Sequence, residues 1–214
     1  RNDGHVIGIA VAVEGLSWYF PIRHELGSNF DPTITFNWLR DVVAKDRDYI
    51  FHNAPYDVGW LRAEGIEVKG RIVDTMVCAP LINENRFSYS LNALSRDYLQ
   101  EYKSEKGLRE AAETFGVNPK SEMYKLPAQH VGQYAEQDAS LTLRLWQQFK
   151  GLIVKEDVGS VFELETKVLR VIIDMRGKGV CVDLDRAEQV KQKLENQENN
   201  ILKEIKSKSG VNVE

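Results

Sequence analysis

One carboxylate of this sequence lies on the apolar face of a long predicted helix. The helix begins at Pro127 and extends to about residue 154, and its stripe consists of Val131, Tyr134, Leu141, Leu145, Phe149 and Leu152. Asp138 falls on the same stripe, four residues after Tyr134 and three before Leu141. A carboxylate that faces a core is costly unless something pairs with it. The spacing alone leaves open a buried salt bridge, an edge position that reaches water, and a metal ligand.

A second group of polar residues follows a short buried strand. The run HNAPYD occupies residues 52–57, with Asn53 at the strand tip and Asp57 in the first turn of a helix that starts near Pro55. Ligands of open α/β sheets bind at the carboxyl ends of strands, so both side chains are candidates for a site. The alternative is structural, because acidic residues favour the first turn of any helix and Asn is common in turns.

Three further polar residues are predicted to be structural. Asp74 ends a strand and is expected to cap the next helix rather than to take part in catalysis. His52 and His130 are each isolated, and we give neither a catalytic role. The sequence contains no GxSxG motif, P-loop or dinucleotide-binding fingerprint, so it gives no support for the chemistries that these motifs carry.

The elements that must position these residues follow from periodicity and turn signals. Strands are predicted at residues 5–14, 17–23, 49–51 and 71–73, with a tight hairpin at Glu14-Gly15. Helices are predicted at residues 31–46, 55–65, 75–82, 90–100, 105–115, 127–154, 158–175 and 184–207. This order indicates an α/β domain with a mixed sheet, and the pattern changes near residue 156, where we place a domain boundary.

The bulk composition indicates a globular protein. The chain has 214 residues, of which 43% are hydrophobic and 28% charged, and a formal net charge of -4. No apolar run is long enough to span a bilayer, and no signal pattern opens the chain, so we expect a cytoplasmic protein without a membrane partner. Cys78 and Cys181 are predicted to be buried free thiols rather than part of a zinc site.

Taken together, the motifs resemble the 3′→5′ exonuclease domain of family A DNA polymerases, in the DEDD exonuclease superfamily. The second motif of that family, Asn-x-x-x-Asp, is matched by Asn53 and Asp57. Its third motif, Tyr-x-x-x-Asp on a helix, is matched by Tyr134 and Asp138. The run VDTMVCAPLI also looks like the strand and helix that the family often has between them.

The resemblance continues beyond residue 156. The run FELETKVLRVIIDMRGKGVCVDLD looks like the segment that joins the exonuclease domain to the polymerase thumb. The resemblance therefore implies an N-terminally truncated exonuclease domain at residues 1–155 and thumb-base helices that begin a polymerase domain at residues 156–214. Because the chain starts with Arg1, we expect a fragment of a longer protein.

The sequence departs from the family in its first motif. That motif is Asp-x-Glu on the first strand, and none precedes the predicted hairpin at residue 5. In the ribonuclease-H-like fold that the resemblance implies, the first strand lies in the middle of the sheet. We therefore expect a gap beside strand 5–14 and the loss of two of four metal-binding carboxylates.

The resemblance implies proofreading by phosphodiester hydrolysis at a DNA 3′ end, with two Mg²⁺ or Mn²⁺ ions. Asp138 would bind the ion nearer the nucleophile and Tyr134 would orient the attacking water. Asp57 would hold the second ion through water, and Asn53 would steady that shell or the substrate. The implied partner of this DNA polymerase is the single-stranded 3′ end of primer-template DNA, bound by a monomer in a bacterial or phage-infected cell.

Two other functions remain open at this point. The first is a catalytically inert exonuclease-like module that only supports a polymerase or binds DNA. The second is a free-standing 3′→5′ ribonuclease with the same motifs, against which the polymerase-like run near residue 179 argues. Without the first motif, we expect this chain by itself to be nearly inactive.

Overall fold

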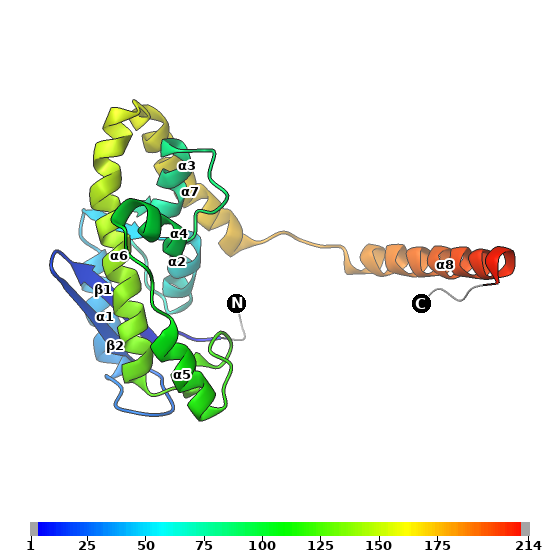
Figure 1. Cartoon of the computed structure of the whole chain (residues 1–214), viewed down its shortest axis with the longest axis horizontal. Coiled ribbons are helices and arrows are strands. Elements are labelled where there is room, and N and C mark those ends of the chain that lie inside the picture. The colour runs from blue at the N-terminus through cyan, green and yellow to red at the C-terminus, as the bar shows by residue number, and fades with distance from the viewer. Residues whose placement is uncertain (1–3, 211–214) are drawn as a thin grey trace. The chain divides into compact units, whose positions relative to one another are not determined.

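The computed structural model describes residues 4–210 and divides the chain into two compact units, Arg1–Gly177 and Lys178–Glu214. The first unit contains both sheets and the helices that surround them (Figure 1). Its helices are α1 (Pro32–Val43), α2 (Ala54–Ala63), α3 (Thr75–Ile82), α4 (Leu91–Leu94), α5 (Lys106–Phe115), α6 (Ala128–Lys155) and α7 (Gly159–Lys178). A π-helical turn, η1 (Ser95–Leu99), follows α4, and a 3₁₀ turn, η2 (Met123–Lys125), precedes α6.

The first sheet is the predicted hairpin. Strand β1 (Gly8–Val13) pairs antiparallel with β2 (Leu16–Pro21). The turn between them contains Gly15 at a φ of +77°, a left-handed conformation that glycine adopts without steric cost. Pro21 ends β2, as expected for a residue that cannot donate to a sheet.

The second sheet pairs β3 (Asp48–Phe51) with β4 (Arg71–Asp74) in parallel, so that Phe51 lies opposite Asp74. Within residues 4–210 no hydrogen-bonded strand joins the two sheets, and β1 and β3 therefore each keep one unpaired edge. The combination of an antiparallel and a parallel pair confirms the predicted mixed arrangement. The gap expected beside residues 5–14 stays a prediction.

Helix α6 is the element that packs against both sheets, because it contacts β1, β2 and β3. At its N-terminal end Gly132 faces β2, and a Cβ there would come within 3.2 Å of Tyr19 Cδ1. Toward its C-terminal end it buries apolar residues against Val73 and Cys78. The predicted stripe is confirmed: Val131, Leu141, Leu145 and Phe149 are buried, and Tyr134 and Leu152 are half-buried.

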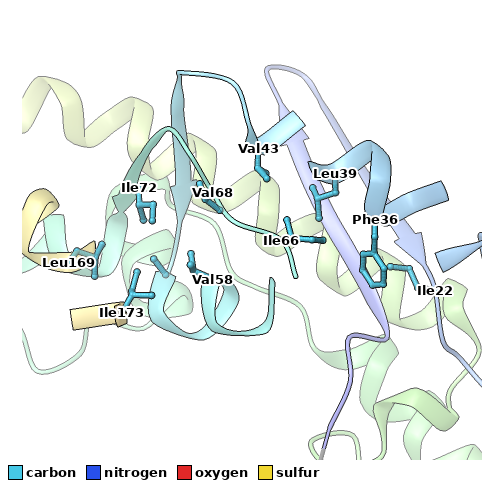
Figure 2. Close-up of a cluster of buried hydrophobic side chains, with 11 residues drawn as sticks. Ile22, Phe36, Leu39, Val43, Val58, Ile66, Val68, Ile72, Leu169 and Ile173 are labelled. Carbon is cyan, nitrogen blue, oxygen red and sulfur yellow. The ribbon is translucent and has the colours of Figure 1, made fainter. Parts of the chain in front are cut away.

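A separate core cluster connects α1, α2, β4 and α7 (Figure 2). Phe36 and Leu39 enter it from α1, and Val58 from α2. Leu169 and Ile173 of α7 belong to the same cluster, so α7 packs with the first unit. The assignment of residues 156–214 to the start of a polymerase domain stays a prediction.

The second unit is dominated by α8 (Leu184–Ser209), whose N-terminus is capped by Asp183 accepting from Arg186 N at 2.9 Å. Of the two free cysteines, Cys78 is buried as predicted, but the prediction for Cys181 was wrong, because that residue is exposed. It lies in a stretch between α7 and α8 that belongs to neither sheet. Nowhere between residues 4 and 210 is a helix both long and apolar enough to cross a membrane.

Candidate active site

The candidate site is centred on one face of α6. Tyr134 and Asp138 are four residues apart in this helix, so both side chains project from the same face about one turn apart. Lys103 Nζ donates to Asp138 Oδ2 at 2.7 Å and to Tyr134 OH at 2.6 Å. The same ammonium group lies 4.0 Å from the centroid of the Tyr134 ring. A salt bridge therefore provides one partner of the carboxylate that the sequence placed on the apolar stripe.

The second oxygen of Asp138 has a different environment. Oδ1 is buried, and within the described part of the chain it has no hydrogen-bond partner. Burial raises the pKa of the Asp138 carboxyl above its usual value, and the bond from Lys103 opposes this rise without cancelling it. A buried oxygen with free lone pairs is a suitable ligand for a hard divalent cation, which prefers oxygen donors.

The other candidate pair lies at the junction of β3 and α2. Asn53 has φ 68° and ψ 52°, the left-handed conformation that Asn tolerates better than most residues. Its side chain is exposed and makes no capping hydrogen bond to the helix. Asp57 lies in the first turn of α2 and is half-buried. The turn thus leaves the Asn53 amide available to a substrate or to a hydrated ion.

The backbone of this junction is held by Asp74, at the end of the neighbouring strand. Its carboxylate accepts from the backbone N–H groups of Asn53 at 2.9 Å and Ala54 at 2.7 Å. It also accepts from Met76 N at 2.9 Å, which confirms the predicted cap of α3. The side chain is almost fully buried, with 2% exposure. Burial raises the pKa of Asp74, and the backbone hydrogen bonds oppose this rise.

His52 connects this junction electrostatically to Lys103. Thr75 Oγ1 donates to Phe51 O at 3.1 Å, so the proton in the 2.8 Å contact between Thr75 and His52 belongs to His52 Nδ1. Burial first, and the positive charge of Lys103 second, lower the pKa of His52 to about 4. His52 is thus a neutral structural residue at neutral pH, in agreement with the role predicted for it.

We expect the free energy of unfolding to decrease as the pH falls from about 6.5 to about 4. In that window His52 is protonated in the unfolded chain but stays neutral in the folded one. The stability that neutral His52 contributes is therefore complete above pH 6.5 and is lost as the pH falls to about 4. The shift from 6.5 to about 4 corresponds to about 3 kcal/mol. Urea unfolding across this pH range should show a smaller loss for His52→Asn than for the unmodified chain. The exposed His5→Asn is the control, and equal losses in all three proteins would contradict the prediction.

The carboxylates do not yet form a metal site on their own. Among the residues that the structure describes, no three His, Cys, Asp or Glu side chains are grouped closely enough to hold a metal ion. Asp138 Oδ1 has the chemistry of a ligand for a hard divalent cation, because it is a buried carboxylate oxygen without a hydrogen-bond partner among the described residues. The described residues therefore do not by themselves provide a group of ligands that could hold a divalent cation.

Two residues of the site were missed from the sequence. Lys103 lies in the polar run QEYKSEK, which has no periodicity and no motif, so no signal pointed to it. Asp74 was predicted as a helix cap, but its second role at Asn53 and Ala54 was not foreseen. The parallel pairing of β3 and β4 could have indicated it, because this pairing brings Asp74 beside Phe51, just before the HNAPYD run.

Comparison with known sequences gives the family. The model of the 3′-5′ exonuclease domain of DNA polymerase A matches residues 2–153. The chain is 34% identical to a DNA-directed DNA polymerase of Pseudomonas phage M6 over 214 residues, which are 98% of this chain and 32% of the relative. It is also 34% identical over 194 residues to the DNA polymerase DpoZ of Salmonella phage PMBT28, covering 87% of this chain and 30% of the relative. The chain therefore spans about a third of the length of these relatives.

Solved structures support the fold. The polymerase domain of Pol1 from M. smegmatis, in complex with DNA primer-template and dNTP, superposes with a TM-score of 0.72 at 20% identity, over 98% of this chain and 32% of that one. The apo form of a nuclease superposes with a TM-score of 0.57 at 14% identity, over 75% of this chain and 70% of that one. The predicted α/β, ribonuclease-H-like fold is confirmed. This chain belongs to the 3′-5′ exonuclease domain family of family A DNA polymerases.

Proposed function

We propose that this chain provides the proofreading activity of a DNA polymerase, by hydrolysing phosphodiester bonds at single-stranded DNA 3′ ends. The observation that carries the proposal is the pairing of Tyr134 and Asp138 on one face of α6, with the unpartnered Asp138 Oδ1 buried beside them. Residues 156–214 would then begin the polymerase domain. The similarity of this chain to phage polymerases over nearly its whole length supports this assignment.

Each candidate residue would have its own role in the hydrolysis. Asp138 and Asp57 would hold two Mg²⁺ or Mn²⁺ ions, with further carboxylates supplied by a strand that completes the sheet between β1 and β3. When bound, such ions activate a water molecule and stabilise the leaving 3′ oxygen. Tyr134 would orient the attacking water through its hydroxyl group. Asn53 would bind the substrate strand through its exposed amide.

The burial of Tyr134 and the packing of α6 favour the roles proposed for Tyr134 and Asp138. Burial raises the pKa of the Tyr134 hydroxyl, although Lys103 partly opposes the rise, so the group keeps the proton that it would donate to a water molecule. Asp138 is carried by a helix that is packed against both sheets, which restricts the movement of its backbone. A rigid backbone keeps the side chains of a site in place, and this holds the nucleophile within reach of a phosphate.

The proposal is tested by comparing this chain with the polymerase proposed to carry it. We expect the polymerase to shorten a 5′-labelled single-stranded DNA from its 3′ end in Mg²⁺, and EDTA to stop the reaction. We expect the 214-residue chain by itself to be slower by at least about 100-fold, because its described residues contain no group of three His, Cys, Asp or Glu side chains that could hold a metal ion. Full activity of the isolated chain would contradict the need for further carboxylates.

The same assay distinguishes the two rival functions. A polymerase that never shortens the strand at any Mg²⁺ or Mn²⁺ concentration would identify the chain as an inert supporting module. Faster digestion of a matched RNA strand than of DNA would favour the ribonuclease. Preference for the DNA strand, together with faster removal of a mismatched than of a paired 3′ nucleotide, is the result expected for proofreading.

A further inference from the structure

Lys103 places a positive charge on the carboxylate that is proposed to bind metal. Its ammonium group bridges Asp138 Oδ2 and Tyr134 OH, at 2.7 Å and 2.6 Å, and lies over the Tyr134 ring. The Lys103 side chain is 10% exposed and that of Asp138 is 28% exposed, so water screens the pair only partly. The site therefore already contains an internal cation.

The segment that carries Lys103 is held in place by side chains rather than by secondary structure. Residues 100–105 lie between η1 and α5 and belong to neither. On one side of Lys103, Glu101 Oε2 accepts from Arg144 Nη1 of α6 at 2.8 Å. On the other side, the backbone N–H of Ser104 donates to Gln137 Oε1 of α6 at 3.2 Å. Two contacts with the same helix thus direct Lys103 toward Asp138.

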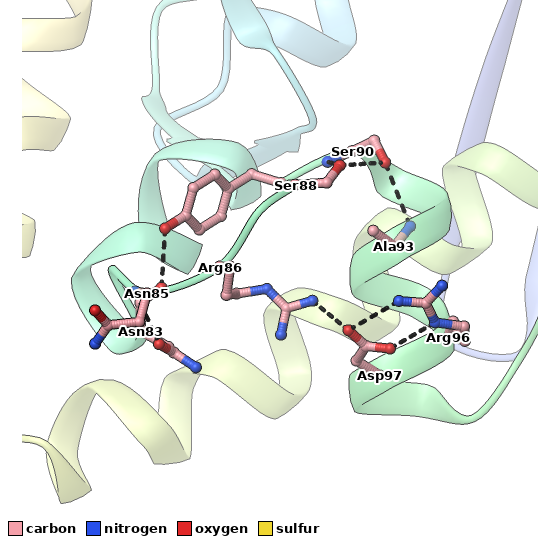
Figure 3. Close-up of polar contacts among 9 residues, drawn as sticks. Asn83, Asn85, Arg86, Ser88, Ser90, Ala93, Arg96 and Asp97 are labelled. Carbon is pink, nitrogen blue, oxygen red and sulfur yellow. Dashed lines mark hydrogen bonds and ion pairs between the residues drawn. The ribbon is translucent and has the colours of Figure 1, made fainter.

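The stretch immediately before this segment is fixed as well. Asp97 of η1 accepts from Arg86 Nη2 at 2.5 Å and from Arg96 Nε at 2.7 Å (Figure 3). These bonds, that from Arg96 first, lower the pKa of Asp97 to about 2, so the bridge persists at neutral pH. The backbone N–H of Lys103 itself donates to Asn92 Oδ1 at 3.2 Å. The Lys103 backbone is thereby anchored on both sides of the side chain that reaches Asp138.

A divalent ion and the Lys103 ammonium group cannot both occupy this face of Asp138 at low cost. Both are cations, and their repulsion over a few ångströms is strong in a partly buried site. The side chain has four rotatable carbon bonds and reaches the site from an anchored backbone. Rotation about these bonds would move the ammonium group away from Asp138 without unfolding of the segment.

We propose that Lys103 is an internal counter-cation that neutralises Asp138 through Oδ2 and holds Tyr134 until a divalent ion that binds Oδ1 displaces it. The inference rests on the proposed function, since it requires Asp138 to be a metal ligand. It adds a residue that sets the metal affinity of the site. In this role Lys103 pairs with the Asp138 carboxylate in the metal-free protein. Without that partner, a buried and unpaired carboxylate would strongly destabilise the fold.

The test is a titration with Mn²⁺ of the polymerase proposed to carry this chain, because the described residues do not by themselves form a metal-holding group, and electron paramagnetic resonance measures the free ion. Removing the competing charge in Lys103→Met should lower the Kd for Mn²⁺ by about tenfold or more. Asp138→Asn should abolish this binding. Lys125→Met is the matched control, because Lys125 also contacts a carboxylate, Glu122 Oε1 at 2.6 Å, and a tyrosine ring, but lies outside the site. The Kd of Lys125→Met for Mn²⁺ should equal that of the unmodified protein.

A second measurement keeps the test informative if Lys103→Met folds poorly. Mn²⁺ should raise the thermal midpoint of Lys103→Met more than that of the unmodified protein, because the ion replaces the lost partner of Asp138. Unchanged or weaker Mn²⁺ binding by Lys103→Met, with binding still lost in Asp138→Asn, would overturn the role of Lys103 and leave the proposed function intact. Equal binding by the unmodified protein and Asp138→Asn, or no binding by any protein, would overturn Asp138 as a metal ligand.

Discussion

Replacing Asp138 by Asn is expected to slow the removal of 3′ nucleotides from single-stranded DNA by at least about 1000-fold, or about 4 kcal/mol of transition-state stabilisation. The substitution keeps the shape of the side chain and removes its charge. The buried Oδ1 and the bridged Oδ2 would then belong to a neutral amide, which is a weak ligand for a divalent cation. The rate is measured under single-turnover conditions in the polymerase proposed to carry this chain.

The control for this prediction is Asp174→Asn. Asp174 is also a helical carboxylate in a salt bridge, with its Oδ1 2.7 Å from Arg62 Nη2, but its side chain is 60% exposed and lies outside the site. We expect that variant to retain the full rate, and polymerisation to be unchanged in both proteins. An Asp138→Asn protein with the unmodified rate in Mg²⁺ would show that the carboxylate is structural and would exclude the proposed mechanism.

Replacing Asp74 by Ala is expected to lower the free energy of unfolding by about 3–5 kcal/mol, which is at the upper end for a single substitution. The change removes the acceptor of three backbone N–H groups, those of Asn53, Ala54 and Met76. Because Asp74 is 2% exposed, water cannot readily replace the lost acceptor. The left-handed backbone at Asn53 would also lose its support.

Asp31→Ala is the matched comparison for this effect. Asp31 caps α1 by accepting from Ile34 N at 2.9 Å, but this cap is exposed and involves no second element. An exposed cap of this kind contributes about 1 kcal/mol. Urea unfolding at neutral pH measures both variants. Similar losses for the two proteins would mean that Asp74 acts only as a helix cap, without tying β4 to the β3–α2 junction.

The local elements of the fold were predictable because their signals are local. The stripe from Val131 to Phe149 repeats with the helical period, and the structure buries it as expected. Asp31 and Pro32 open α1 as a cap and a first helical residue. The Glu14-Gly15 turn joins β1 and β2 in the predicted hairpin. In each case the residues that specify the structure are within a few positions of one another.

The partner of Asp138 could not be predicted in the same way. The helical period alone places Asp138 on the apolar stripe, and a carboxylate in that position needs a partner. The sequence therefore showed the need for a partner but not its identity. The structure supplied Lys103, which is 35 residues away in a stretch without periodicity. Likewise, Asp74 is 20 residues from Ala54, and only the pairing of β3 with β4 brings the carboxylate to that backbone.

By itself, then, the sequence determined the type and order of the elements, the face of α6 that carries Tyr134 and Asp138, and the motifs that indicate an exonuclease. Only the tertiary structure decided that α6 packs against both two-stranded sheets, and that a lysine from the segment after η1 neutralises Asp138. The physical reason is that periodicity and capping depend on neighbours in the chain, whereas the partner of a buried charge depends on which distant segment packs against it.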